Sequence, residues 1–292
     1  LCNGEGDRLS GLVIDVLGPH VVIQASALWC MSHRVAIENA IHRIKPGIGC
    51  TSVIWKVAES RLRQDGYEQE LEDESDDTLD SSIVVKENDC VYKVDPQGGQ
   101  KTGFYCDQRD NRAKLRQYCK DKTVLDTFCY SGGFSINALK GQARLVTAVD
   151  SSEYALKLAK ENMKLNGYDL DGSKRIELVK DDAIKYMKTC ADQGRLYDIV
   201  ICDPPKLAPS RSTLPRAINK YLKINTAGLK VVNSGGLFMT CTCSGAMSQN
   251  MDKFFNMLHE AAKLAKKEIK ILSVSNAAKD HPVQLGYRES NY

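Results

Sequence analysis

The sequence predicts a doubly wound α/β fold with a mostly parallel sheet, preceded by a smaller α+β domain. From about residue 122 an apolar run and a helix-length segment alternate five times. Strands that alternate with helices in this way form parallel sheets with right-handed crossovers. The chain has 292 residues, enough for one large domain and a smaller one. Its 42% hydrophobic and 26% charged residues exclude general disorder and a fibrous architecture.

Residues 1–97 are predicted to form the smaller domain. Two β-branched runs flank Gly18-Pro19 within 9–25, which is typical of a β-hairpin. Apolar residues at helical spacing predict a helix over 31–44. Strand character returns in three further segments: 51–57, 82–86 and 90–94. The segment between them, 67–80, has eight carboxylates and no Lys or Arg. Because it has little to bury, it is interpreted as a solvated acidic loop rather than an acidic interaction tail.

Residues 98–292 are predicted to form the larger domain. Its strands are expected near 123–128, 145–149, 176–179, 197–202 and 236–242. Its helices are expected near 132–140, 152–166, 182–191, 213–232 and 247–265. A sixth strand is expected at 268–274, and the sheet is expected to lack its last strand. Ligands of such sheets bind beyond the carboxyl ends of the strands, so functional residues are sought there.

Charge and cysteine content limit the partners and the compartment. The formal net charge is +3, and without the eight carboxylates of 67–80 the remainder carries +11, which favours a polyanionic partner. Eleven cysteines are scattered singly and are interpreted as reduced thiols of an intracellular, by default cytoplasmic, protein. No spacing suits a metal, and no apolar run reaches the ~18 residues of a membrane span. The chain begins at Leu1 and shows no leader, and it is interpreted as a fragment or a processed form. Because a targeting peptide would then not be visible, an organelle is the alternative compartment.

The first two strand ends carry acidic residues. Asp126–Phe134 contains one Gly-Gly pair, which allows close approach of a ligand or serves only as a structural turn. Asp150 ends the second apolar run, where a carboxylate can accept both hydroxyls of a ribose. The alternative is that Asp150 or Ser151 merely caps the helix that begins near Ser152.

The next two strand ends are also acidic. Asp181 and Asp182 are adjacent, so one is expected to cap a helix and the other to accept from an exocyclic amino group. The alternative is that helix capping is their whole role. Asp203 is followed by Pro204-Pro205, which removes two backbone donors and fixes an extended turn. A rigid group of acceptors at this point suits a planar heteroaromatic base, and a plain loop is the alternative.

The fifth strand end, Thr240–Gly245, carries two thiols. Cys243 is nearer the end of the strand and is the better candidate for a nucleophile, whereas Cys241 is expected to pack within the strand. N–H groups of a helix that starts near residue 246 would lower the pKa of such a thiol from its reference of ~8.5.

Several segments together carry a family resemblance. They are Asn3–Asp7, Gly11–Asp15, Lys101–Tyr105, Asp107–Asp110, Tyr130–Phe134, Asp203–Lys206, Cys243–Gly245 and Asp280–Val283. The chain resembles the class I S-adenosylmethionine-dependent methyltransferases. It resembles most closely the bacterial large-subunit ribosomal RNA cytosine-5 methyltransferases, which have a PUA domain, a central α+β domain and a catalytic domain with a Rossmann-like fold. The PUA domain, an RNA-binding module, is missing from this sequence.

The resemblance implies a role for each matched residue. The cofactor-binding set contains Gln108, Arg109, Asp126, Tyr130, Ser131, Gly132, Gly133, Asp150, Ser151, Asp182 and Asp203. Of these, Asp150 would bind the ribose of S-adenosylmethionine and Asp182 its adenine amino group. Asp203 would hold the target cytosine, and Cys243 would attack it. The partner implied is large-subunit ribosomal RNA. The oligomeric state is left open, with a homodimer among the alternatives.

Three functions are alternatives to an RNA cytosine-5 methyltransferase. An amino-group methyltransferase would favour an aromatic residue after the Asp-Pro-Pro sequence, but Lys206 stands there. A non-catalytic RNA-binding assembly factor would be expected to have lost the acidic strand ends and Cys243, which are present. A nicotinamide-dependent dehydrogenase would need the Gly-x-Gly-x-x-Gly pattern, which is absent. His281 matches a family position, although a structural loop histidine is an equal interpretation.

Overall fold

The computed structural model describes residues 1–67, 82–170, 174–208, 211–287 and 290. Apart from Tyr67, the acidic segment 67–80 lies outside these residues. The chain divides into two compact units. The first contains Leu1–Gln108 together with Ala278–Ser290, and the second contains Arg109–Ala277. The first unit therefore continues beyond residue 97 and takes back a segment from the far end of the chain. Within the described ranges, no helix combines the length and apolarity needed to cross a lipid bilayer.

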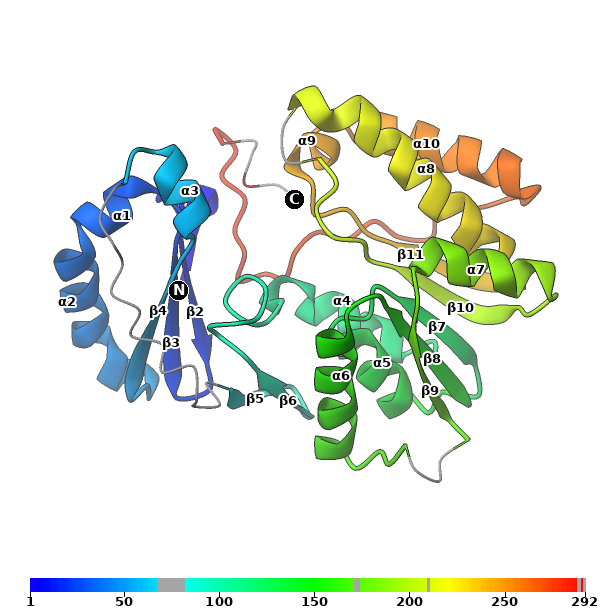
Figure 1. The fold of residues 1–292 in the computed structure, drawn as a ribbon, viewed down its shortest axis with the longest axis horizontal. Coiled ribbons are helices and arrows are strands. Elements are labelled where there is room, and N and C mark those ends of the chain that lie inside the picture. The colour runs from blue at the N-terminus through cyan, green and yellow to red at the C-terminus, as the bar shows by residue number, and fades with distance from the viewer. Residues whose placement is uncertain (68–81, 171–173, 209–210, 288–289, 291–292) are drawn as a thin grey trace. The chain divides into compact units, whose positions relative to one another are not determined.

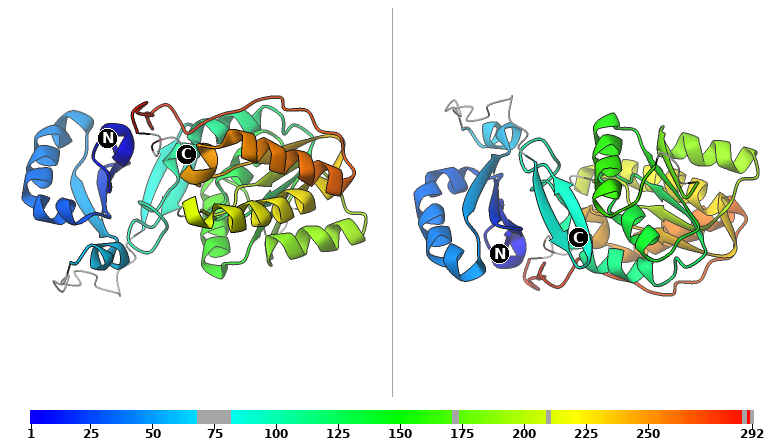
Figure 2. Two further views of the ribbon diagram at one scale, coloured as in Figure 1. Left: turned by 90° about the horizontal axis from the view of Figure 1, so that it is seen from above. Right: turned by 90° about the horizontal axis from the view of Figure 1, so that it is seen from below.

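The first unit is built on a four-stranded sheet in the order β1-β2-β3-β4. These strands are Cys2–Asn3, Leu12–Leu17, His20–Ala25 and Ser52–Val57. The pairs β1/β2 and β2/β3 are antiparallel, and β3/β4 is parallel. Helices α1 (Leu28–Ser32) and α2 (Arg34–Ile44) cover one face of this sheet (Figure 2). Helix α3 (Glu59–Gln64) and a separate hairpin, β5 (Ile83–Glu87) and β6 (Cys90–Val94), complete the unit, with short 3-10 turns at Gly4–Asp7, Lys45–Ile48 and Cys106–Gln108.

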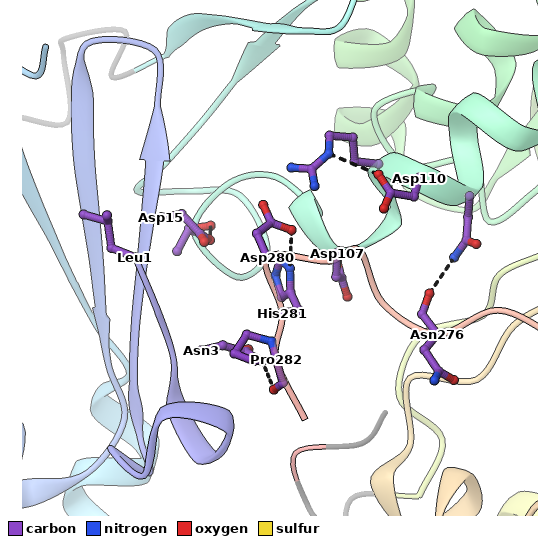
Figure 3. A network of polar contacts seen from close by, with 12 residues as sticks. Leu1, Asn3, Asp15, Asp107, Asp110, Asn276, Asp280, His281 and Pro282 are labelled. Carbon is purple, nitrogen blue, oxygen red and sulfur yellow. Dashed lines mark hydrogen bonds and ion pairs between the residues drawn. The ribbon is translucent and has the colours of Figure 1, made fainter. Parts of the chain in front are cut away.

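The returning segment is attached to the first unit by local polar contacts, some of which are drawn in Figure 3. The side-chain amide of Asn3 donates to the Pro282 carbonyl at 3.4 Å, and the Ala278 amide donates to the Asp107 carbonyl at 2.8 Å. Nδ1 of His281 lies 3.1 Å from a carboxylate oxygen of its neighbour Asp280. These contacts place His281 in a loop of the first unit.

The second unit contains a five-stranded parallel sheet in the order β11-β10-β7-β8-β9. In chain order its strands are Thr123–Thr127 (β7), Leu145–Asp150 (β8), Ile176–Lys180 (β9), Tyr197–Cys202 (β10) and Val232–Thr240 (β11). Helices α4 (Arg109–Arg116), α5 (Gly133–Lys140) and α6 (Glu153–Leu165) lie on one face (Figure 1). Helices α7 (Ala183–Asp192), α8 (Leu214–Lys230) and α10 (Met251–Ala265) lie on the other, with two short turns at Arg211–Thr213 and α9 (Gly245–Ser248). The doubly wound fold predicted from the sequence is confirmed.

The predicted sixth strand at 268–274 is wrong. This segment follows α10 but is neither a strand nor a helix. Its apolar residues Ile271, Leu272 and Val274 are 58%, 77% and 60% exposed. The apolar pattern alone suggested a strand, but a strand needs a neighbour to which its backbone can pair. Among the described residues, β11 pairs only with β10, so the segment joins no ladder there.

Helix α8 approaches the sheet closely at Gly228. A Cβ atom at this position would lie 2.6 Å from Cε2 of Phe238 on β11 and 3.1 Å from Sγ of Cys202 on β10. Both distances are shorter than ordinary van der Waals contact. The absence of a side chain at Gly228 therefore lets the long helix that follows β10 pack tightly over β10 and β11.

Replacing Gly228 by Ala is expected to destabilise the second unit by about 1–3 kcal/mol, because the added methyl overpacks this contact. Thermal unfolding of the full chain measures the loss. Gly47→Ala is the matched control, since a Cβ there meets nothing within 4 Å. A Gly228→Ala protein as stable as Gly47→Ala would contradict the close packing of α8.

Candidate active site

Polar residues from all five strands of the second unit gather at one edge of its sheet. Because the strands are parallel, their carboxyl ends share this edge. Asp126 and Asp150 lie at the ends of β7 and β8, and Asp182 follows β9. Asp203 follows β10 and Cys243 follows β11. The fold thus brings together the five strand ends that the sequence analysis singled out.

Asp126 is a buried carboxyl group at the centre of this edge, only 1% exposed. Ser135 of α5 donates a hydrogen bond of 2.6 Å to its Oδ2, and Oδ1 has no hydrogen-bond partner. Burial raises the pKa of Asp126 to about 7; the nearby carboxylates of Asp203 and Asp150 add to the rise, and the Ser135 hydrogen bond opposes it. An unpartnered buried oxygen of this kind favours a cationic ligand.

The turn between β7 and α5 is tightly wound. Phe128, Tyr130 and Gly132 all have positive φ, of 62°, 47° and 80°. Asp150 fixes this turn, since its Oδ2 accepts from the Tyr130 amide at 3.0 Å and its Oδ1 from the Ser152 amide at 2.9 Å. Each carboxylate oxygen still has a lone-pair site for a ligand hydroxyl. The helix cap of α6 is Ser152, so the alternative that Asp150 or Ser151 caps it is wrong.

The Gly-Gly pair of this turn is surrounded by side chains. A Cβ at Gly132 would lie 3.2 Å from the Cβ of Ala159, and one at Gly133 would lie 3.0 Å from Cδ of Arg112. Ser131 is buried, and its carbonyl accepts from the side-chain amide of Asn162 at 3.0 Å. Arg112 is only 3% exposed and escaped the sequence analysis. Arg112 lies in a helix of mostly polar residues, so nothing in the sequence indicated that its side chain would be buried.

After β9, the two adjacent aspartates have different roles. Asp182 caps α7 by accepting from the Lys185 amide at 2.9 Å through Oδ1. Asp181 accepts from the Asp182 amide at 2.9 Å and forms an ion pair of 3.2 Å with Lys185. Asp182 is exposed, and its Oδ2 carries no hydrogen bond to the described residues. That oxygen is available to an amino group.

A buried hydroxyl joins the loops after β10 and β11. Ser244 Oγ accepts from the amides of Leu207 and Ala208 at 3.1 and 3.0 Å. It also lies 3.1 Å from the hydroxyl of Tyr221 on α8, which in turn lies 2.8 Å from Oγ1 of Thr242. The sequence pattern by itself assigns no role to Ser244 or Tyr221. The only available sign was that Ser244 follows Cys243 directly.

Cys243 lies beside the Asp203-Pro204-Pro205 turn, with its Sγ 3.7 Å from the Pro204 carbonyl oxygen. All eleven cysteines lie within the described ranges and are in the thiol form. Burial raises the pKa of Cys202 to about 12 and that of Cys129 well above its ordinary value. Cys241 and Cys243 are only half-buried. They are therefore the two thiols at this edge that a substrate can reach.

Cys241 continues the strand pairing, because its amide donates to the Cys202 carbonyl at 2.9 Å. Cys243 lies beyond this last pair, as expected from the sequence. The helix after Cys243 was expected to lower the pKa of the thiol, but the adjacent helix, α9, has only four residues and the long helix begins at Met251. A single helical turn has only a small macrodipole, so α9 gives little stabilisation to a thiolate at Cys243.

Gln108 and Arg109 belong to different units. Gln108 ends the first unit, and Arg109 begins α4, where its Nε lies 3.3 Å from Asp110 Oδ1. Asp107, beside them, pairs with Lys101 Nζ at 2.7 Å, and Lys101 lies 4.6 Å from the centre of the Tyr105 ring. The segment before α4 is thus fixed by contacts within the first unit. Among the described residues, no group of His, Cys, Asp and Glu side chains has the arrangement of a metal site.

Comparison with known proteins agrees with this geometry. The model of a family described as S-adenosylmethionine-dependent methyltransferases matches residues 41–276. This chain belongs to that family. Proteins named ribosomal RNA large subunit methyltransferase I, from Klebsiella pneumoniae strain 342 and Pseudoalteromonas translucida, are each 36% identical to it. The alignments cover 100% of this methyltransferase and 71% and 72% of those proteins.

A solved structure extends the similarity to the whole fold. It is the crystal structure of a protein described as a methyltransferase, in complex with SAH, the demethylated form of the cofactor. It is 25% identical to this methyltransferase, with a TM-score of 0.82, over 100% of this chain and 72% of the other. S-adenosylmethionine is therefore the cofactor of this methyltransferase, as predicted. The orphan oxygen of Asp126 and the tight Gly132-Gly133 turn fit a cofactor with a cationic end.

The buried Asp126 is expected to make the methyltransferase less stable as pH rises. An unfolded Asp ionises near pH 3.9, whereas the folded carboxyl holds its proton to about pH 7. The folded state binds more protons between these values, so stability falls by about 4 kcal/mol across the interval. Asp126→Asn should therefore raise Tm at pH 8, with the gain shrinking toward pH 4.

Asp198 provides a control of opposite sign. Although burial acts to raise its pKa, hydrogen bonds from Thr123 and Asn233 lower it overall. The ionised Asp198 carboxylate therefore stabilises the fold at pH values above the pKa of an unfolded Asp, and this stabilisation is lost as pH falls. Asp198→Asn should therefore lower Tm at pH 8, and its deficit should shrink in acid. An Asp126→Asn protein that is less stable than wild type at pH 8 would refute the assignment.

Proposed function

We propose that this methyltransferase forms 5-methylcytosine in large-subunit ribosomal RNA through a covalent adduct of Cys243. The substrate class is supported by the name of the relatives, which align over the whole of this chain. The chemistry is supported by one observation above all. A half-buried thiol lies 3.7 Å from the Pro204 carbonyl, beside Asp203, whereas the neighbouring Cys129 and Cys202 are buried and hard to ionise.

Residues at the sheet edge would hold the cofactor. The free oxygen of Asp126 and the Tyr130–Gly133 turn suit its methionine part, which ends in an ammonium group. Asp150 suits the ribose, with Ser151 beside it, and the free Oδ2 of Asp182 suits the adenine amino group. The cofactor-binding role that the family resemblance implies for Gln108 and Arg109 stays a prediction. When bound, S-adenosylmethionine supplies an electrophilic methyl group on a sulfonium sulfur.

Cytosine needs activation because its carbon 5 is a weak nucleophile. The thiolate of Cys243 adds to carbon 6, forming an S–C bond and breaking the π bond between carbons 5 and 6, so that carbon 5 becomes electron-rich. Asp203 stabilises the adduct at ring nitrogen 3, where a proton can be held. After transfer, a base takes the carbon 5 proton, the C–H electron pair restores the double bond between carbons 5 and 6, and the S–C bond breaks to release the thiolate. The cytosine must leave its stack to reach Cys243.

The adduct can be trapped with RNA that carries 5-fluorocytosine. Fluorine cannot leave as a proton does, so wild type should remain covalently attached after transfer. Cys243→Ala should give no adduct and lose methylation by several orders of magnitude, while still binding S-adenosylmethionine. Cys241→Ala is the matched thiol control and should trap normally. Denaturing electrophoresis and mass spectrometry of the adduct give the readout.

Each other outcome rejects a different part of the proposal. A trap that forms only through Cys241 would move the nucleophile two residues. Methylation that persists in both variants without any trap would reject thiol catalysis in favour of an amino-group methyltransferase. A wild-type protein that binds S-adenosylmethionine and RNA but transfers no methyl group would instead be an assembly factor on the same fold.

Asp150→Ala is expected to weaken S-adenosylmethionine binding by about 1.5–3 kcal/mol, the worth of hydrogen bonds to a charged group. Isothermal titration calorimetry measures this change directly. Asp192→Ala, at the distal end of α7, should bind normally. Because Asp150 also fixes the Tyr130 turn, Asp150→Asn is the second variant, and it should bind more weakly than wild type with a smaller loss of Tm. Full affinity in both would remove Asp150 from the site.

A further inference from the structure

Helix α8 carries a row of cationic side chains that the methyl-transfer chemistry does not use. Arg216, Lys220 and Lys223 are spaced four and three residues apart, so they lie on one face of the helix. All three are exposed. We call these three residues the α8 cationic row. Lys230, one further heptad along, is exposed in the same direction.

The charge of the row is not compensated. Helix α8 contains no Asp or Glu, and no acidic side chain of the described residues forms an ion pair with Arg216, Lys220 or Lys223. One of the two lysines of the neighbouring α7 differs, because Lys185 pairs with Asp181 at 3.2 Å. An uncompensated row of this kind attracts polyanions to its face.

The row begins at the edge of the sheet that carries the candidate site. Helix α8 follows β10, so its first turn, with Arg216, lies toward the carboxyl edge where Asp203 and Cys243 are found. The buried face of the same helix holds Tyr221, whose hydroxyl is bonded to Thr242 and Ser244. The row is therefore fixed to the loop of the proposed nucleophile by hydrogen bonds through its own helix.

The chemistry of the row favours phosphate groups over a protein surface. Asn219, which lies beside Lys220 and Lys223, is polar, and none of the large exposed apolar side chains of the described residues belongs to α8. Protein interfaces use apolar and aromatic anchors at their centre, whereas nucleic-acid backbones are held by Lys, Arg and amide side chains. Seven residues of helix span about 10 Å. That is enough for two or three successive phosphates at about 3.4 Å each along a helix axis.

We propose that the α8 cationic row binds the phosphate backbone of the RNA next to the target nucleotide. This inference rests on the proposed function, whose substrate it assigns to a surface. The row would hold the strand while the base enters the site between Asp203 and Cys243. It contributes affinity rather than sequence preference, because phosphate contacts carry no base information.

The test is a charge reversal in the full chain, Lys220→Glu with Lys223→Glu. Binding is measured by fluorescence anisotropy with a labelled single-stranded RNA oligonucleotide of mixed sequence. The salt concentration is varied from roughly 50 to 300 mM, the range in which salt weakens phosphate contacts. We expect affinity to fall at least about tenfold and the salt slope to fall by about 2, since each phosphate-binding lysine contributes about 1. Affinity for S-adenosylmethionine should not change.

The matched control is Lys157→Glu with Lys164→Glu on α6, on the opposite face of the sheet. Both lysines are exposed, and the change in net charge is the same. This control should change RNA affinity by less than about threefold, because only the general field differs. Lys220→Gln with Lys223→Gln serves as a second, milder variant and should give a smaller loss in the same direction.

Three outcomes would overturn the proposal: equal losses in the α8 and α6 variants, unchanged RNA affinity in both α8 variants, or polyglutamate binding as tight as that of RNA. The last would assign the row to an acidic protein partner. These outcomes are separate from failure of the proposed function. A wild-type protein that binds RNA through the row but makes no 5-methylcytosine would leave the row standing and reject the chemistry.

Discussion

Ser244 lies fully buried between the loops that follow β10 and β11, and its hydroxyl takes part in three hydrogen bonds. Two backbone amides of the β10 loop use both of its lone pairs, so its proton must point to Tyr221, and the Tyr221 proton to Thr242. This consistent donor order joins two loops and a helix around two buried side chains, Ser244 and Tyr221. This hydrogen-bond network sets how far apart Asp203 and Cys243 lie, because each of these two residues is within a few residues of a network member. It also positions α8, which carries Tyr221.

The second organising feature is an imbalance of charge. Parallel strands collect Asp126, Asp150 and Asp203 at one edge. Burial, with a smaller addition from the neighbouring carboxylates, raises the pKa of Asp126 to about 7. The sheet edge thus loses folding stability in return for a group of carboxyls that favours a cationic ligand, as sites of function often do. All the charged side chains that helix α8 exposes are positive. The fold therefore offers opposite charges to the cofactor and to the proposed RNA.

The Lys101–Tyr105 motif has a structural part that the family resemblance alone did not reveal. Thr102 donates to Asp15 of β2 at 2.6 Å, and Lys101 pairs with Asp107, whose carbonyl accepts from Ala278. These contacts bind a hairpin, a loop and the returning segment of the first unit together. The residues immediately before α4 are thereby held at fixed positions within that unit.

The sequence alone determined the alternating strands and helices, and with them the edge at which Asp126, Asp150, Asp182, Asp203 and Cys243 gather, because a parallel sheet places every strand end on the same side. Periodicity did not determine segment 268–274, since an apolar pattern gives the preference for a strand but not the partner that a strand requires. Tertiary structure alone decided the roles of Ser135, Ser244, Tyr221 and Arg112, which hold their positions through partners 9 to 37 residues away or through burial. It also decided which thiol is accessible, because the exposure and pKa of a cysteine depend on what packs around it rather than on its neighbours in sequence.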